Sequence, residues 1–335
     1  MDPAQAPAPD GRAGRSRVPD RQDARHQDQR RVLRGDEALS ASPEHRLRGI
    51  LAMLVSVASF SVMDSLLKLL SEHYAALQVA CIRGTAALPF VLAPIVVRGR
   101  LARLKPVNVK LHLLRGVLSV VMLASFVLAV RETSLASTYA IFMCAPLLVA
   151  ALSAPLLGEK VAGAQWGAIG VGLAGVLLML KPTGADWATA GALWAVVAVA
   201  MYTVSVVTLR ILARTDTNES MVFWFTAMLA LGAGVLAIPG WRDLQAAHLP
   251  LMAGVGLCGA LGQYFITVAF RSAPAATVTP FEYTALVWGV MLDVAIWSVW
   301  PSTVTLVGGG IVIGAGLYLI DRERRTSAAA AVPGA

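Results

Sequence analysis

The stretch that decides the fold runs from residue 133 to residue 180 and reads TSLASTYAIFMCAPLLVAALSAPLLGEKVAGAQWGAIGVGLAGVLLML. It contains two apolar segments, 133–157 and 161–180, and a short polar break around Glu159 and Lys160 separates them. Each segment has the roughly 20 apolar residues that an α-helix needs to cross a bilayer. The stretch therefore predicts two successive transmembrane helices.

The same alternation continues in both directions from this stretch. Counting from Gly49, ten apolar segments follow one another with short polar breaks between them. Their approximate bounds are 49–70, 77–97, 112–130, 133–157, 161–180, 187–209, 219–239, 250–271, 274–297 and 302–320. We therefore predict an all-α membrane protein with ten transmembrane helices.

The composition excludes a water-soluble globular protein. Of the 335 residues, 57% are hydrophobic and 14% are charged, and the mean hydropathy is +0.66. A soluble domain has about a quarter charged residues. Although the net charge is +8, no basic face interleaved with aromatic residues and no DNA-binding motif accompanies it, so no nucleic-acid partner is expected.

The sequence also lacks the motifs of common enzymes and metal sites. Three cysteines lie far apart within apolar segments, and the five histidines form no metal-binding pattern. No GxSxG elbow and no phosphate-binding glycine loop is present. We expect no metal, no cofactor and no enzymatic activity.

The two ends of the chain are predicted to lie in the cytoplasm. Residues 1–47 are rich in Arg, Asp, Gln and Pro, which favours a disordered tail, and residues 323–335 form a second, short tail. Loops on the same side as the N-terminus, together with the C-terminal tail, hold 13 Lys and Arg residues. The other side holds four, which are Lys68, Arg131, Lys181 and Arg242. By the positive-inside rule this imbalance places both termini inside.

An internal repeat divides the chain into two halves. Shifting the sequence by 140 residues superimposes the third to fifth segments on the eighth to tenth, with Gly116 on Gly256 and Gly170 on Gly310. Each half has five spans, an odd number, so the halves must insert with opposite orientations. We predict two inverted five-helix repeats, 48–184 and 185–322, an arrangement that places substrate near the middle of the membrane.

Particular motifs in both halves resemble those of one superfamily. In the first half they are Ala145-Pro146, the run Pro155-Leu156-Leu157-Gly158-Glu159-Lys160 and the glycines at 167, 170, 172 and 175. In the second half they are Pro280-Phe281-Glu282-Tyr283-Thr284, Trp288 and Gly308-Gly309-Gly310. This pattern resembles the drug/metabolite transporter superfamily, specifically its ten-helix members with two EamA repeats. One departure is Ser298-Val299-Trp300-Pro301, where the family often repeats a Gly-Glu pair.

The resemblance implies a secondary carrier in a bacterial-type inner membrane that moves a small organic solute without hydrolysing ATP. Amino-acid, vitamin or nucleoside-like metabolites are the substrate classes that it suggests. A drug or toxic-metabolite exporter is the alternative within this class. A membrane-embedded enzyme acting on a lipid-linked substrate is the alternative outside it, and Asp64 with Asp293 would be its carboxylate pair.

Ionisable residues within the predicted spans are the first candidates for the site, because a charge in the bilayer core costs at least ~2.5 kcal/mol. Asp64 and Arg83 lie at similar depths and could pair. Glu282, just after Pro280, is the candidate for proton coupling. Asp293 is expected near the membrane surface, and Lys68 is expected to extend its side chain to that surface.

Aromatic residues could shape a pocket for a planar or cationic solute. The candidates are Phe60, Tyr139, Tyr202, Tyr264, Tyr283 and Trp288. Pro146 and Pro280 fall in matching segments of the two halves, where broken helices would mark the site. The pairs Gly163–Gly167 and Gly310–Gly314 are GxxxG motifs, expected to pack helices within the bundle or in a homodimer.

Overall fold

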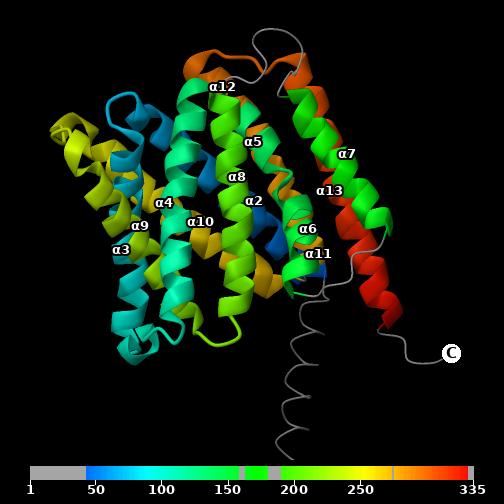
Figure 1. Ribbon diagram of the computed structural model, residues 1–335, viewed down its shortest axis with the longest axis horizontal. Coiled ribbons are helices and arrows are strands. Elements are labelled where there is room, and N and C mark those ends of the chain that lie inside the picture. Colours follow the sequence, from blue (N-terminus) through cyan, green and yellow to red (C-terminus); the bar gives the residue numbers. More distant parts are fainter. Residues whose placement is uncertain (1–42, 158–162, 180–189, 274, 331–335) are drawn as a thin grey trace, which may run out of the picture.

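The computed structural model describes residues 43–157, 163–179, 190–273 and 275–330, and Figure 1 shows their long helices side by side in a bundle. The described residues form helices and loops and no β-strand. The α-helices are α2 (Pro43–Ser71), α3 (Ala76–Val97), α4 (Val109–Glu132), α5 (Leu135–Phe142), α6 (Ala145–Leu157), α7 (Gly163–Met179), α8 (Ala190–Leu212), α9 (Asn218–Ala237), α10 (Leu249–Ser272), α11 (Ala275–Val278), α12 (Ala285–Trp297) and α13 (Thr303–Ala330). Four short 3-10 helices, η1 (Leu101–Leu104), η2 (Ile238–Gly240), η3 (Ala246–His248) and η4 (Thr279–Thr284), lie between them.

Each of the ten predicted spans corresponds to a helix or to a broken helix. Within the described ranges, eight helices are long and apolar enough to cross a membrane, and α7 is a shorter apolar helix. The remaining span is divided into α11, η4 and α12. The chain is therefore an all-α membrane protein.

Helices from the two halves of the chain pack against one another in matching pairs. The longest contacts are those of α2 with α10 and of α4 with α8, and α3 packs along α9 while α7 packs along α13. The broken segments lie between these pairs. The α5–α6 segment contacts α8, and the segment from α11 to α12 contacts α2.

The two broken helices resume at positions that are 140 residues apart. In the fourth span a turn at Met143 and Cys144 separates α5 from α6, which starts at Ala145. In the ninth span the 3-10 helix η4 precedes α12, which starts at Ala285. The prolines themselves are not equivalent, because Pro146 lies just after the first break whereas Pro280 lies within the second.

Two helices extend further than the sequence indicates. α2 begins at Pro43, so residues 43–47 are helical, and α13 continues to Ala330 through most of the predicted C-terminal tail. Residues 1–42, the break at Glu159 and Lys160 and the predicted boundary at 184/185 lie outside the described residues.

The predicted GxxxG pairs do not form the close helix contacts. A Cβ atom built on Gly163, Gly167, Gly310 or Gly314 would meet no atom within 4 Å. The close approach of α7 and α13 lies instead at Gly175 and Gly308, where a Cβ on Gly175 would lie 3.0 Å from the Gly308 carbonyl oxygen. The prediction that the GxxxG pairs pack helices within the bundle is therefore wrong, since both pairs face open space.

Candidate functional site

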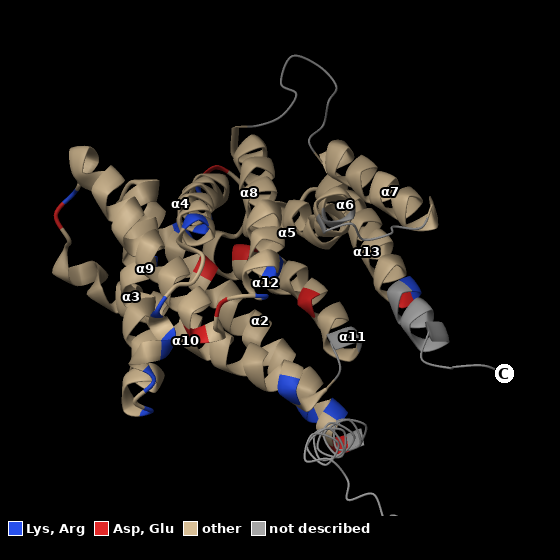
Figure 2. Ribbon diagram, turned by 60° about the horizontal axis from the view of Figure 1, so that its bottom comes forward, with Lys and Arg blue, Asp and Glu red and all other residues tan. Residues whose placement is uncertain are grey.

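Few charged residues lie among the helices. Figure 2 shows a ribbon that is mostly free of Lys, Arg, Asp and Glu, with a few acidic and basic positions within the bundle and others at helix ends. A buried charge needs a partner or a function. These positions therefore define where the site should be sought.

Asp293 on α12 binds the start of α5. Its Oδ1 accepts a hydrogen bond from the N–H of Leu135 at 3.0 Å, and its Oδ2 accepts one from the N–H of Ala136 at 2.8 Å. The first N–H groups of a helix have no partner within the helix, and the helix dipole favours a negative charge there. Because Asp293 is 0% exposed, this contact ties α5 to α12 in the interior.

Lys68 on α2 contacts both Asp293 and the loop before α5. Its Nζ lies 3.5 Å from Asp293 Oδ1, donates a hydrogen bond to the Thr133 carbonyl oxygen at 3.0 Å and lies 4.4 Å from the centre of a Trp297 ring. Both Lys68 and Asp293 are buried. The prediction that Lys68 extends its side chain to the membrane surface is therefore wrong, because protein covers the side chain. Asp293 is also covered by protein, but its expected depth near the end of α12 stays a prediction.

Asp64 lies one helical turn before Lys68 on α2 and contacts α5. The hydroxyl of Tyr139 donates a hydrogen bond to Asp64 Oδ2 at 2.8 Å. Arg83 on α3 is close enough to interact electrostatically with Asp64, but the two side chains do not form an ion pair within 4 Å. Three predicted site residues are thus brought together, with the tyrosine as the direct partner.

Glu282 lies in the second helix break, within η4. Tyr202 on α8 is close enough to interact electrostatically with its carboxylate. Among the described residues the Glu282 carboxylate has neither a hydrogen-bond nor an ion-pair partner. Next to it, the buried hydroxyl of Tyr283 also lacks a hydrogen-bond partner there.

An aromatic contact lies at the first helix break. The rings of Phe142, at the end of α5, and Tyr202 are 6.2 Å apart, and Phe126 packs edge-on against Phe142 at 5.5 Å. Tyr202 thus reaches the first break through Phe142 and the second through Glu282. The two breaks and their aromatic rings form one candidate site between the halves.

The other predicted pocket residues pack in different ways. Phe60 packs against Gly262 of α10 and also against the buried cluster that contains Tyr139. Trp288 packs, together with Phe281, against a buried cluster formed by α2, the end of α10 and α11. Tyr264 on α10 is 63% exposed, so its side chain is turned away from the bundle.

A polar contact that is not among the predicted ones lies at the start of α4. His112 on α4 and Asp216, in the loop before α9, lie 2.9 Å apart between Nε2 and Oδ1. Desolvation alone would raise the pKa of Asp216, but hydrogen bonds from the Val107 N–H, His112 and the Thr215 hydroxyl hold it below its usual value. This contact joins the two loops at that end of the bundle. An aspartate just after one apolar segment and a histidine at the start of another were its only sequence signals.

Within the described residues, no three His, Cys, Asp or Glu side chains lie close enough to hold a metal ion together. Cys81, Cys144 and Cys258 are all free thiols. The site is therefore made of carboxylates, an arginine and aromatic rings, which can bind an organic solute or a proton.

Comparisons with known proteins point to one family. Residues 47–181 match the model of the EamA-like transporter family, and curated relatives named as transporters align over 94–96% of their own lengths. Over residues 47–181 this chain is therefore similar to the EamA-like transporters. It is a multi-pass membrane protein of the drug/metabolite transporter type.

The relatives of this EamA-like protein are named for different solutes and for different directions of transport. The riboflavin transporter of Rhizobium johnstonii is 25% identical over 86% of this chain and 96% of its own length. The pseudopaline exporter CntI of Pseudomonas aeruginosa is 29% identical over 81% and 95%, and the S-adenosylmethionine uptake transporter of Rickettsia prowazekii is 24% identical over 84% and 95%. A crystal structure with 19% identity, covering 83% of this chain and 96% of that chain, superimposes with a TM-score of 0.56. This likeness shows a shared fold.

Proposed function

We propose that this EamA-like protein is a secondary carrier that moves a small organic metabolite by alternating access and couples that movement to protons through Glu282. The observation that carries the proposal is Glu282 itself, a carboxylate that has no partner among the described residues and lies inside a broken membrane helix. Irregular backbone at this depth is tolerated where it lines a cavity or lies within protein. A carboxylate there can take up a proton on one side and release it on the other.

The helix pairing supports two inverted repeats, 48–184 and 185–322. In the predicted repeat, α2 corresponds to α8 and α4 corresponds to α10. The contact of α2 with α10 therefore has a counterpart in the contact of α8 with α4, and both contacts are present. The same correspondence maps the α3–α9 and α7–α13 contacts onto themselves. Two halves that pack in this way can rock against each other around the helix breaks.

The substrate class follows from the chemistry of the side chains between the halves. Asp64 and Arg83 offer opposite charges, while Phe142 and Tyr202 offer rings for stacking. We infer a solute with a charged group and a planar or apolar part, such as an amino-acid, vitamin or nucleoside-like metabolite. Because relatives are named for both uptake and export, a metabolite exporter is the second candidate.

A membrane enzyme is disfavoured because its candidate carboxylates are already engaged. Both oxygens of Asp293 accept backbone hydrogen bonds, and Asp64 accepts one from Tyr139. General acid–base catalysis needs a carboxyl group within reach of the substrate. We therefore propose transport, not catalysis, in the cytoplasmic membrane of a bacterium.

The proposal is tested with purified protein in proteoliposomes. Riboflavin, S-adenosylmethionine and an opine would be screened as radiolabelled substrates for exchange without a gradient and for accumulation driven by a pH gradient. We expect Glu282→Gln to keep exchange and to lose the pH-driven accumulation, because glutamine cannot carry a proton. Glu219→Gln, which alters an exposed ion pair, is the control and should behave like the wild type.

Two outcomes would contradict the proposal. If the wild type accumulates an accepted substrate equally with and without a pH gradient, the coupling is wrong. If Glu282→Gln retains pH-driven accumulation, another group carries the proton.

A further inference from the structure

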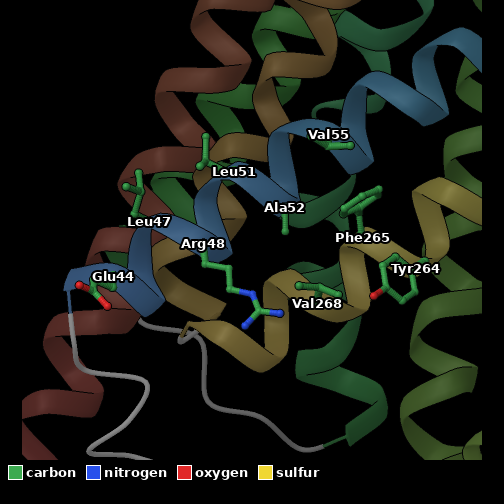
Figure 3. Close-up of a pocket in the computed structure, with 9 residues that line it drawn as sticks. All are labelled: Glu44, Leu47, Arg48, Leu51, Ala52, Val55, Tyr264, Phe265 and Val268. Carbon is green, nitrogen blue, oxygen red and sulfur yellow. The ribbon is translucent and has the colours of Figure 1, made fainter.

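A groove of about 440 Å³ lies between α2 and α10 (Figure 3). Its apolar walls are formed by Leu51, Ala52, Val55, Phe265 and Val268, and Glu44, Leu47, Arg48 and Tyr264 line it as well. Leu51 and Val55 are exposed although they lie on a membrane-spanning helix. The groove therefore opens sideways, toward the hydrocarbon chains of the bilayer.

An arginine without a partner lies at one end of this groove. Arg48 is exposed, and among the described residues it has no ion pair or hydrogen bond. Glu44, four residues earlier on α2, is the position from which a carboxylate ordinarily pairs with an arginine. Figure 3 shows the Arg48 side chain extended away from Glu44, below Ala52 and toward Val268. Its guanidinium group thus lies at the entrance of an apolar groove.

A second arginine lies at the same end of the helix pair. Arg271 is an exposed residue in the last turn of α10. That turn packs tightly on the start of α2, because a Cβ built on Gly49 would lie 2.7 Å from the Ala273 Cβ and 3.2 Å from the Ala269 carbonyl oxygen. Arg271 therefore lies at the same end of the helix pair as Arg48, although it is not among the residues that line the groove.

We propose that this groove binds a phospholipid with an anionic headgroup, its phosphate at Arg48 and Arg271 and one acyl chain along Leu51, Val55 and Phe265. The distance from Arg48 to Val55 along α2 is roughly 10 Å, which is room for much of an acyl chain. A guanidinium group can bind a phosphate through two parallel hydrogen bonds. Basic residues near the membrane surface also attract anionic lipids. The site does not depend on which solute the protein carries.

An anionic phospholipid would contact both the apolar walls and the arginines, whereas free phosphate would contact the arginines alone. Phosphate alone would satisfy the arginines but would leave the apolar walls unoccupied. A zwitterionic lipid would occupy the space between the apolar walls, but the two arginines would attract its headgroup less strongly. An anionic phospholipid uses the walls and the charges together.

The test uses the full chain purified in a mild detergent and native mass spectrometry. The protein would be incubated with equal amounts of phosphatidylglycerol and phosphatidylcholine, and the retained lipid would be counted. We expect phosphatidylglycerol to be retained preferentially, and Arg48→Ala to lower its retention about fivefold, the effect of one basic residue at a membrane surface. Arg48→Lys should lie between these values, because lysine keeps the charge but not the fork of donors.

Further variants test the contribution of the apolar groove separately from that of the charge of Arg48. Val55→Trp fills the groove from an exposed position and should lower retention of both lipids, and Leu51→Trp serves the same purpose if the first variant is poorly folded. Arg214→Ala removes an exposed arginine from the loop before α9 and is the matched control that should not change retention.

Three results would overturn the proposal. Equal retention of the two lipids, or unchanged phosphatidylglycerol retention in Arg48→Ala, would show that Arg48 does not select an anionic headgroup. If glycerol 3-phosphate raises the melting temperature as much as phosphatidylglycerol does, the site binds free phosphate and the groove plays no part.

Discussion

Lys68 of α2 and Asp293 of α12 form an ion pair inside the bundle, with 3.5 Å between Nζ and Oδ1 and side-chain exposures of 11% and 0%. The pair joins the first predicted span to the ninth. Asp293 also holds two backbone N–H groups of α5, whereas Lys68 also holds the Thr133 carbonyl oxygen. Besides the ion pair, Asp293 therefore binds two backbone groups, whereas Lys68 binds one.

Asp293→Asn should destabilise the protein more than Lys68→Met does. The asparagine removes the carboxylate that forms the ion pair with Lys68 and turns an N–H group toward the start of α5, which should cost about 3–5 kcal/mol of unfolding free energy. In Lys68→Met, Asp293 keeps its two backbone donors. Thermal unfolding in detergent measures the difference. The exposed variant Glu219→Gln should cost less than about 1 kcal/mol. Equal losses in the two interior variants would contradict this order.

Tyr139→Phe should slow transport without unfolding the protein. It removes the 2.8 Å hydrogen bond to Asp64, and hydrogen bonds to a charged group contribute about 1.5–3 kcal/mol. We expect the exchange rate in proteoliposomes to fall about tenfold. Tyr264→Phe changes an exposed tyrosine and should exchange at the wild-type rate. Wild-type exchange in Tyr139→Phe would remove Asp64 and Tyr139 from the transport site.

The stabilising contribution of Asp216 should be lost when the pH is lowered into the acid range. Because hydrogen bonds hold its pKa below its usual value in the folded protein, its contribution is fully present above the unfolded pKa, about 3.9, and is lost as the pH falls through the lower folded value. Melting temperatures between pH 6 and pH 3 should therefore fall less steeply in Asp216→Asn than in the wild type. Asp243→Asn, at an exposed loop position, should follow the wild-type curve, and parallel curves for all three proteins would contradict the assignment.

Gly175→Leu should disrupt the contact of α7 with α13. A Cβ at residue 175 would lie 3.0 Å from the Gly308 carbonyl oxygen, so a larger side chain must separate the helices. The same change at Gly170, where a Cβ meets nothing within 4 Å, should be tolerated. Size-exclusion profiles and melting temperatures compare the two, and similar behaviour of both variants would show that the close approach is unimportant.

Both termini should lie in the cytoplasm. Green fluorescent protein fused after Ala335 should fluoresce in cells, and alkaline phosphatase fused there should be inactive. Alkaline phosphatase inserted after Arg242, in the loop between α9 and α10, should be active. The opposite pattern would reverse the orientation that the positively charged loops indicate.

Helix number and position could be predicted from sequence because the length and polarity of the segments determine them. Predicting which residues meet was harder. Similar depths indicated that Asp64 and Arg83 could pair; they lie close enough to interact electrostatically, but they form no ion pair within 4 Å. Depth does not determine direction, so the pairing of Lys68 with Asp293 under a cover of protein was not predicted. Tyr264 was assigned to the pocket although its side chain faces outward.

The helix breaks were only partly predictable. Pro146 and Pro280 indicated which spans are broken, yet the equivalent points are the helix starts at Ala145 and Ala285, which no single residue type marks. The Gly175–Gly308 approach was likewise missed. A GxxxG pattern shows that small residues share a helix face, but the orientation of the helix decides whether another helix packs there.

The hydrogen bonds from Leu135 and Ala136 to Asp293 set an order for the assembly of the chain during its synthesis. The carboxylate is 158 residues downstream of Leu135, so the ribosome has made the first five spans long before it exists. Until the ninth span is inserted, two N–H groups at the start of α5 lack this acceptor. The first half therefore cannot reach its final hydrogen bonding alone, and a chain stopped after residue 180 should be an early target for membrane proteases.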